Sequence, residues 1–131
     1  MDMTLPQIVL IAAAAIALAF AVRRAYLRAV IRQIGPRELQ ELLPRQSDVV
    51  LLDVRNADER ARDHIKGSLH VPVGDLLRKI DTLEKHRNRL IVVYCQTGSR
   101  SLAAAATLRK HGFQVANLKG GMGEWNFSAR T

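Results

Sequence analysis

Apolar residues are arranged in two different ways along the chain. From Ile8 to Val22, fifteen apolar residues follow one another without interruption, and the run extends back to Met3 with no charged residue in it. A helix needs about 20 such residues to cross the hydrocarbon core of a bilayer. The pattern therefore predicts one N-terminal transmembrane helix. Apolar residues at helical spacing among arginines predict that a basic juxtamembrane helix continues from it, until Gly35-Pro36 ends it.

The charges on the two sides of the apolar run are unequal. Asp2 precedes the run, and arginines follow it at positions 23, 24, 28 and 32. Basic flanks stay on the cytoplasmic side of a membrane, so we expect the N-terminus outside and the rest of the chain in the cytoplasm. A cleavable signal peptide has its positive charge before the apolar run, which disfavours that alternative. Because the run is rich in alanine, a buried helix of a soluble protein stays open as another alternative.

After position 35 the pattern changes to short apolar runs that alternate with helical periodicity. The unbroken apolar runs are residues 49–52 and 90–94, a further short strand is predicted over residues 115–118, and the helical segments are residues 36–43, 76–83 and 101–111. Gly112 is expected to end the last of these helices, and Gly120-Gly121 to form a turn. Unbroken apolar strands are typical of parallel sheets that helices cover on both faces. We therefore expect an anchor with its juxtamembrane helix over residues 1–35 and an α/β domain over residues 36–131.

Composition narrows the chemistry that this domain can carry. The 131 residues include 20 Lys and Arg against 12 Asp and Glu, which gives a net charge of +8. The single cysteine excludes an intrachain disulfide and a cysteine-based zinc site, and the four histidines have no metal-ligand spacing, so no metal is expected. No extended stripe of basic residues interleaved with aromatic ones is present, so nucleic acid is not an expected partner.

The single cysteine stands where a parallel sheet usually binds its ligand. Cys95 directly follows the apolar run 90–94 and precedes a polar loop and a helix. Ligands of open parallel sheets bind beyond the carboxyl ends of the strands. Loop N–H groups, a helix N-terminus and the charge of Arg100 would all lower the pKa of the thiol below its free value of about 8.5. The pattern favours a nucleophilic Cys95 in an anion-binding loop, with an inert buried thiol as the alternative. The loop residues are Gln96, Thr97, Gly98, Ser99 and Arg100.

Four segments together resemble the single-domain rhodaneses, the thiosulfate sulfurtransferase family. They occur in the family's order and spacing, and the resemblance covers about residues 36–130. The segments are Leu52-Asp53-Val54-Arg55 and the stretches 63–72, 95–101 and 118–125. The resemblance implies the rhodanese-like fold, a parallel sheet with helices on both faces. Lys66 and Ser68 stand where the family usually has proline and alanine, and these departures concern a turn below the site.

The resemblance also implies a reaction. The Cys95 thiolate would take a sulfane sulfur from thiosulfate or a persulfide donor, and would pass it from a Cys95 persulfide to a thiol, a protein thiol or cyanide. Residues 96–100 would bind the substrate, and no cofactor is implied. Tethered bacterial members with this layout imply contact with membrane lipid and a single-pass position in the inner (plasma) membrane, with the catalytic domain in the cytoplasm. Asp53, Arg55 and Ser101 would support the site.

Two other functions are alternatives to sulfur transfer. Cysteine phosphatases of the related cell-cycle type have five residues between cysteine and arginine, whereas four residues separate Cys95 from Arg100. The shorter loop suits a sulfur atom better than a tetrahedral phosphate or arsenate. A non-catalytic, membrane-tethered docking module is the second alternative, although such a module has no physical need for a complete cysteine loop. Among the remaining residues, His64 and His70 are expected at the rim, and Trp125 in the core or lining the pocket.

Overall fold

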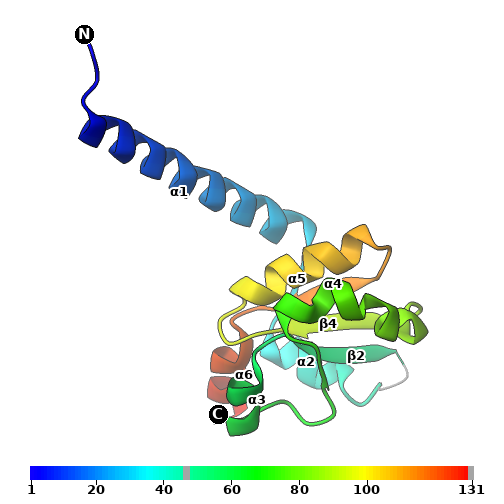
Figure 1. Cartoon of the computed structure of the whole chain (residues 1–131). Helices are drawn as coiled ribbons and strands as arrows, with labels where there is room; N and C mark the ends of the chain where they lie inside the picture. Colours follow the sequence, from blue (N-terminus) through cyan, green and yellow to red (C-terminus); the bar gives the residue numbers. More distant parts are fainter. Residues whose placement is uncertain (46–47, 130–131) are drawn as a thin grey trace. The chain divides into compact units, whose positions relative to one another are not determined.

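The computed structural model describes residues 1–45 and 48–129. The chain divides into two compact units, which meet in the sequence between Val30 and Ile31. The first unit holds helix α1 (Leu5–Val30), drawn in blue in Figure 1. Helix α1 is long and apolar enough to cross a membrane, and a signal sequence near an N-terminus has the same properties.

The second unit begins with a strand where the sequence pattern predicted more helix. The prediction that the helix continues to Gly35 is wrong, because residues 32–34 form strand β1 (Arg32–Ile34), which pairs in parallel with β5 (Val115–Leu118). A strand of three residues shows too little alternation to be told apart from a helical turn, and pairing with its neighbour decides its conformation. The second compact unit begins at Ile31 and includes this strand.

In the described part of the chain, five strands form one parallel sheet in the order β1-β5-β4-β2-β3. The remaining strands are β2 (Val49–Asp53), β3 (Leu69–His70) and β4 (Leu90–Tyr94). Every residue of β2 is buried, as are all residues of β4 except the first. Such burial on both faces is what the unbroken apolar runs predicted.

Helices cover both faces of this sheet. On one face, α2 (Pro36–Leu42) and α6 (Gly121–Ala129) pack over a core that includes Leu39, Val92 and Met122. Figure 1 shows α5 (Ser99–Lys110) and α4 (Leu76–Lys79) on the opposite side of the sheet. The predicted α/β fold class is therefore confirmed.

Several short helices depart from the sequence pattern. The predicted helix over residues 76–83 is divided into α4 and the 3₁₀ helix η2 (Ile80–His86), and a second 3₁₀ helix, η1 (Val73–Asp75), precedes α4. The apolar stripe of the predicted helix is narrower than expected, because Leu77 is 66% exposed. Helix α3 (Ala57–Arg62) was not predicted, since it buries no residue and so leaves no apolar stripe in the sequence.

Candidate active site

Cys95 lies directly after β4, at the carboxyl end of the strand that lies between β5 and β2. Its side chain is buried, with 0% exposure. The chain turns back at Gly98, whose φ of 99° is in the left-handed region that favours glycine. This turn lets the backbone N–H of Gly98 donate a hydrogen bond to the Cys95 Sγ over 3.0 Å. Helix α5 begins at the next residue, so the sulfur lies inside a strand–loop–helix turn as predicted.

The surroundings of Cys95 favour the thiolate over the thiol. Burial acts to raise the pKa of Cys95, but the hydrogen bond between its sulfur and the Ser101 hydroxyl, and those from the backbone N–H groups of Ser101, Gly98 and Thr97, outweigh burial. The pKa of the thiol therefore lies below its ordinary value, because these donors bind the charged form more strongly than the neutral one. The direction of this shift agrees with the sequence prediction.

The N-terminus of α6 closes the loop from the other side. Backbone N–H groups of Met122 and Gly123 donate to the carbonyl oxygens of Cys95 and Gln96, over 2.9 and 3.2 Å. A Cβ atom at Gly121 would lie 2.3 Å from the Cys95 carbonyl oxygen, so no side chain fits there. The glycine pair was predicted as a turn, but its role in bringing a helix against the cysteine loop was not.

Arg100 occupies the first turn of α5, and its guanidinium is held by a partner that the sequence analysis missed. Its Nη1 and Nη2 donate to the two carboxylate oxygens of Glu59, each over 2.7 Å. The hydrogen bond from Arg100 is the main reason why the pKa of Glu59 falls to about 2. Glu59 also forms a capping box with Asn56 at the start of α3. The spacing Asn-x-x-Glu is a recognised signal for a helix start and could have revealed this helix.

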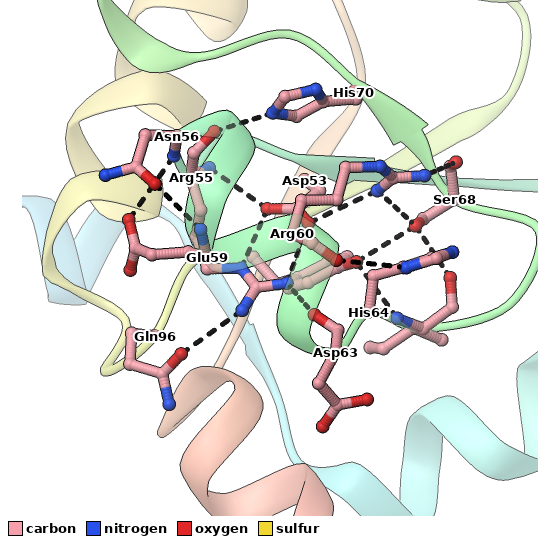
Figure 2. A network of polar contacts seen from close by, with 12 residues as sticks. Asp53, Arg55, Asn56, Glu59, Arg60, Asp63, His64, Ser68, His70 and Gln96 are labelled. Carbon is pink, nitrogen blue, oxygen red and sulfur yellow. Dashed lines mark hydrogen bonds and ion pairs between the residues drawn. The ribbon is translucent and has the colours of Figure 1, made fainter.

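Asp53 and Arg55 form a buried ion pair next to Gln96 of the loop (Figure 2). Arg55 Nε and Nη2 donate to the two carboxylate oxygens of Asp53, over 3.0 and 2.9 Å. Burial acts to raise the pKa of Asp53, and the hydrogen bonds and charge of Arg55 reverse this effect and hold the pKa low. Arg55 Nη1 also donates to Gln96 Oε1 over 3.2 Å. The pair therefore connects the end of β2 with the residue that follows the cysteine.

A second arginine joins this pair to the turn at Ser68. Arg60 Nη1 donates to Asp53 Oδ2 over 3.2 Å and to Ser68 Oγ over 2.9 Å. Ser68 Oγ in turn donates to the Ile65 carbonyl oxygen over 2.6 Å and lies 2.9 Å from the Tyr94 hydroxyl. The hydroxyl that replaces the family's usual alanine is thus satisfied within a buried polar network.

The two histidines expected at the rim also contact this network, through backbone carbonyls (Figure 2). His70 Nε2 lies 2.7 Å from the Arg55 carbonyl oxygen, and His64 Nδ1 lies 3.2 Å from the Arg60 carbonyl oxygen. Trp125 is partly buried against the core, which agrees with a packing role. Within residues 1–45 and 48–129, no group of three or more His, Cys, Asp and Glu side chains is placed to hold a metal ion.

A polar cavity opens beside the loop. Its lining combines one arginine of the buried pair, residues of α3 and the position after it, one loop residue and two residues of α6: Arg55, Glu59, Arg62, Asp63, Gln96, Met122 and Asn126. Asn126 Nδ2 donates to Asp63 Oδ2 across it, over 2.9 Å. Arginine and carboxylate side chains therefore both line the cavity beside the cysteine loop.

Comparison with known proteins agrees with this geometry. The sequence pattern of the rhodanese-like domain matches residues 35–128. The chain belongs to the rhodanese-like family. A protein named sulfurtransferase from Allochromatium vinosum is 32% identical to this rhodanese over 97 residues, covering 73% of this chain and 89% of that protein.

Two solved structures show the same fold. A rhodanese-related protein from Thermoplasma volcanium superposes with a TM-score of 0.68 and 30% identity, covering 74% of this chain and 92% of that one. A thiosulfate sulfurtransferase from Pseudomonas aeruginosa gives a TM-score of 0.68 and 27% identity, covering 76% of this chain but 19% of that longer one. Together these relatives support sulfurtransferase activity for this rhodanese in general terms.

Proposed function

We propose that this rhodanese carries a sulfane sulfur as a persulfide on Cys95, and that its N-terminal helix anchors it to a membrane. The observation that carries the proposal is the setting of the sulfur. Cys95 Sγ lies at the carboxyl end of β4 and accepts the N–H of Gly98 within a loop of four residues before Arg100. A thiol with a lowered pKa in such a loop is a good nucleophile, because the loop N–H groups stabilise the negative charge of the thiolate.

The reaction consists of two displacements at sulfur. In the first, the Cys95 thiolate attacks the outer sulfur of thiosulfate, the sulfur–sulfur bond of the donor breaks, and sulfite leaves with the electron pair. In the second, an acceptor thiolate or cyanide attacks the outer sulfur of the Cys95 persulfide, and the Cys95 thiolate leaves. A covalent intermediate of this kind gives ping-pong kinetics. A persulfide donor reacts in the same way, with a thiolate as the leaving group.

The remaining residues of the site support the sulfur in this proposal. The loop from Gln96 to Arg100 surrounds the outer sulfur and binds the donor. Asp53 and Arg55 fix the loop through Gln96, and Ser101 contacts the Cys95 sulfur over 3.3 Å. The sequence has one cysteine, so the acceptor thiol belongs to another molecule.

Helix α1 supports the membrane part of the proposal. Taken by itself, it is apolar around its whole circumference between residues 8 and 22, and arginines follow this stretch. Such a helix suits the bilayer interior with the arginines on the cytoplasmic side. We place it as a single span of a bacterial inner membrane with the domain in the cytoplasm. A C-terminal green fluorescent protein fusion should fluoresce in the membrane fraction, whereas a C-terminal alkaline phosphatase fusion should be inactive. The reverse result would place the domain outside.

Intact mass spectrometry tests the chemistry. The full chain, purified in detergent, is incubated with thiosulfate or with glutathione persulfide beside the Cys95→Ser variant. We expect the wild type alone to gain one sulfur, about 32 Da, and to lose it again when cyanide or a thiol is added. If neither donor adds mass to the wild type, the domain is a docking module that does not carry sulfur. If the Cys95→Ser variant gains the same mass, Cys95 is not the carrier.

A further inference from the structure

The hydroxyl beside the sulfur has a second partner. Ser101 Oγ lies 3.3 Å from Cys95 Sγ and donates a hydrogen bond to Asn117 Oδ1 over 2.5 Å. Both polar residues are buried, with Ser101 0% and Asn117 3% exposed. A serine hydroxyl has one proton and two lone pairs. It therefore cannot donate to the amide oxygen and to the sulfur at the same time.

Two backbone carbonyls determine which way this proton points. Asn117 Nδ2 donates to Gln33 Oε1 over 3.0 Å and makes a longer contact of 3.5 Å with the Gly98 carbonyl oxygen. Gln33 Nε2 donates to the Ile31 carbonyl oxygen over 3.1 Å. Because carbonyl oxygens only accept, both side-chain amides are fixed with their NH₂ groups toward these carbonyls. Asn117 must then present its oxygen to Ser101, and this oxygen also only accepts.

We infer that Asn117 is a positioning residue that holds the hydroxyl proton of Ser101 away from the sulfur of Cys95, and that Gln33 fixes Asn117 in this orientation. The inference rests on the proposed role of Cys95 as the nucleophile. In the thiol form, the S–H donates to Ser101 Oγ and the O–H donates to Asn117 Oδ1, so every group is satisfied. In the persulfide form the inner sulfur has no proton and no charge, and the same arrangement persists.

Only in the free thiolate form do two acceptors, the Cys95 sulfur and the Asn117 oxygen, compete for the single hydroxyl proton of Ser101. The charged sulfur attracts the hydroxyl proton, but turning the proton toward it leaves the buried oxygen of Asn117 without a donor. An unsatisfied buried acceptor is unfavourable, so Asn117 reduces the stabilisation that Ser101 gives to the thiolate. The thiolate is therefore less stable than it would be without Asn117, where the Ser101 hydroxyl could turn toward the sulfur. The thiol and the persulfide are unaffected. Asn117 thus favours the sulfur-loaded state over the empty thiolate.

Charged groups around Cys95 also affect the ionisation of its thiol, but they are the same in the wild type and in the variants compared below. Arg100 on α5 interacts with the charge of Cys95, and Glu59 on α3 neutralises Arg100 through two hydrogen bonds. Asp53 and Arg55 at the end of β2 form an ion pair with each other, and Arg55 reaches the loop by a hydrogen bond to Gln96. None of these side chains donates to or accepts from Asn117 in the described part of the chain.

The test measures the thiol pKa from the ultraviolet absorbance of the thiolate as a function of pH, with the Cys95→Ser variant subtracted. The signal belongs to Cys95 because the sequence has one cysteine. In the full chain, Asn117→Leu should lower the pKa by about one unit, which is about tenfold more thiolate at a pH below the pKa. Ser101→Ala should raise the pKa, because it removes the donor itself. When Ser101 is already replaced by alanine, Asn117→Leu should leave the thiol pKa unchanged. If Asn117 had a merely structural role, its replacement would shift the pKa whether or not Ser101 is present.

Gln33→Leu keeps the test decisive if Asn117→Leu does not fold, since Gln33 lies on the edge strand β1 and is only partly buried. It should lower the pKa in the same direction by a smaller amount. An unchanged or raised pKa in the folded Asn117→Leu or Gln33→Leu variant overturns the inference. Because the titration needs no sulfur donor, this failure is separate from a failure of the persulfide assay, which would overturn the proposed function instead.

Discussion

The ion pair between Arg100 and Glu59 connects the cysteine loop to α3, and its contribution to stability can be calculated from the structure. The pKa of Glu59 falls from 4.5 to about 2, mainly because of the hydrogen bond from Arg100. At about 1.36 kcal/mol per unit, that shift corresponds to about 3 kcal/mol before screening. The Arg100 side chain is 40% exposed, so solvent reduces the value to about 1 kcal/mol.

The Glu59→Gln variant measures this contribution. Glutamine keeps the shape of the side chain and its capping contact with Asn56, and removes the charge. We expect the variant to lose about 1 kcal/mol of unfolding free energy near neutral pH, measured by urea denaturation of the full chain in non-ionic detergent. Fluorescence of Trp125 reports the transition, because the sequence has one tryptophan and it packs against the core. Asp58→Asn, which neutralises an exposed acid on the same helical turn, serves as the matched control.

The pH dependence gives the sign of the effect. A carboxyl whose pKa is lowered on folding stabilises the protein above its unfolded pKa, and this stability is lost as the pH falls through the folded value. The difference between wild type and Glu59→Gln should therefore decrease as the pH falls from 4.5 to about 2, and vanish only below the folded pKa. If Glu59→Gln costs no more than Asp58→Asn at neutral pH, or if the difference persists at the lowest pH, the pair does not stabilise the domain in this way.

Three further substitutions test the contacts of the site. Asp53→Asn should cost about 3–5 kcal/mol of unfolding free energy in urea, because it leaves the buried guanidinium of Arg55 without its counter-charge; a loss below 1 kcal/mol would contradict the burial of the pair. Gly121→Ala should lower the free energy of unfolding by about 2 kcal/mol or more, since its methyl group would lie 2.3 Å from the Cys95 carbonyl oxygen. The same variant should also reduce sulfur loading in the mass assay. Wild-type loading would show that the loop does not need this helix. Ser68→Ala, which restores the family's usual residue, should lower the free energy of unfolding by about 1 kcal/mol because it removes several buried hydrogen bonds. An unchanged melting temperature would show that these hydrogen bonds do not stabilise the domain.

The elements that could be predicted are those whose own residues determine their conformation. Strands β2 and β4 contain apolar runs buried on both faces, β5 has one polar residue among apolar ones, and the cysteine was found because it directly follows β4. Strand β1 was missed because three residues become a strand only by pairing with residues 116–118. The partner of Arg100 lies 41 positions away and was invisible for the same reason, since no local spacing joins it to the loop. Asn117 lies inside an apolar run, where its polar side chain gave no sign of the hydroxyl it contacts.

The hydrogen bonds from α6 to the cysteine loop impose an order on biosynthesis. During translation, Cys95 leaves the ribosome well before Met122 and Gly123, whose N–H groups donate to the loop carbonyls. Until those residues emerge, the strand that carries the cysteine can pair with β2 while the loop lacks its support. We therefore expect a purified chain truncated before Gly120 to contain a cysteine that takes no sulfur from thiosulfate, unlike the chain that includes α6. The thiol would then depend on a helix that follows it in the sequence by about 26 residues for the support of its loop.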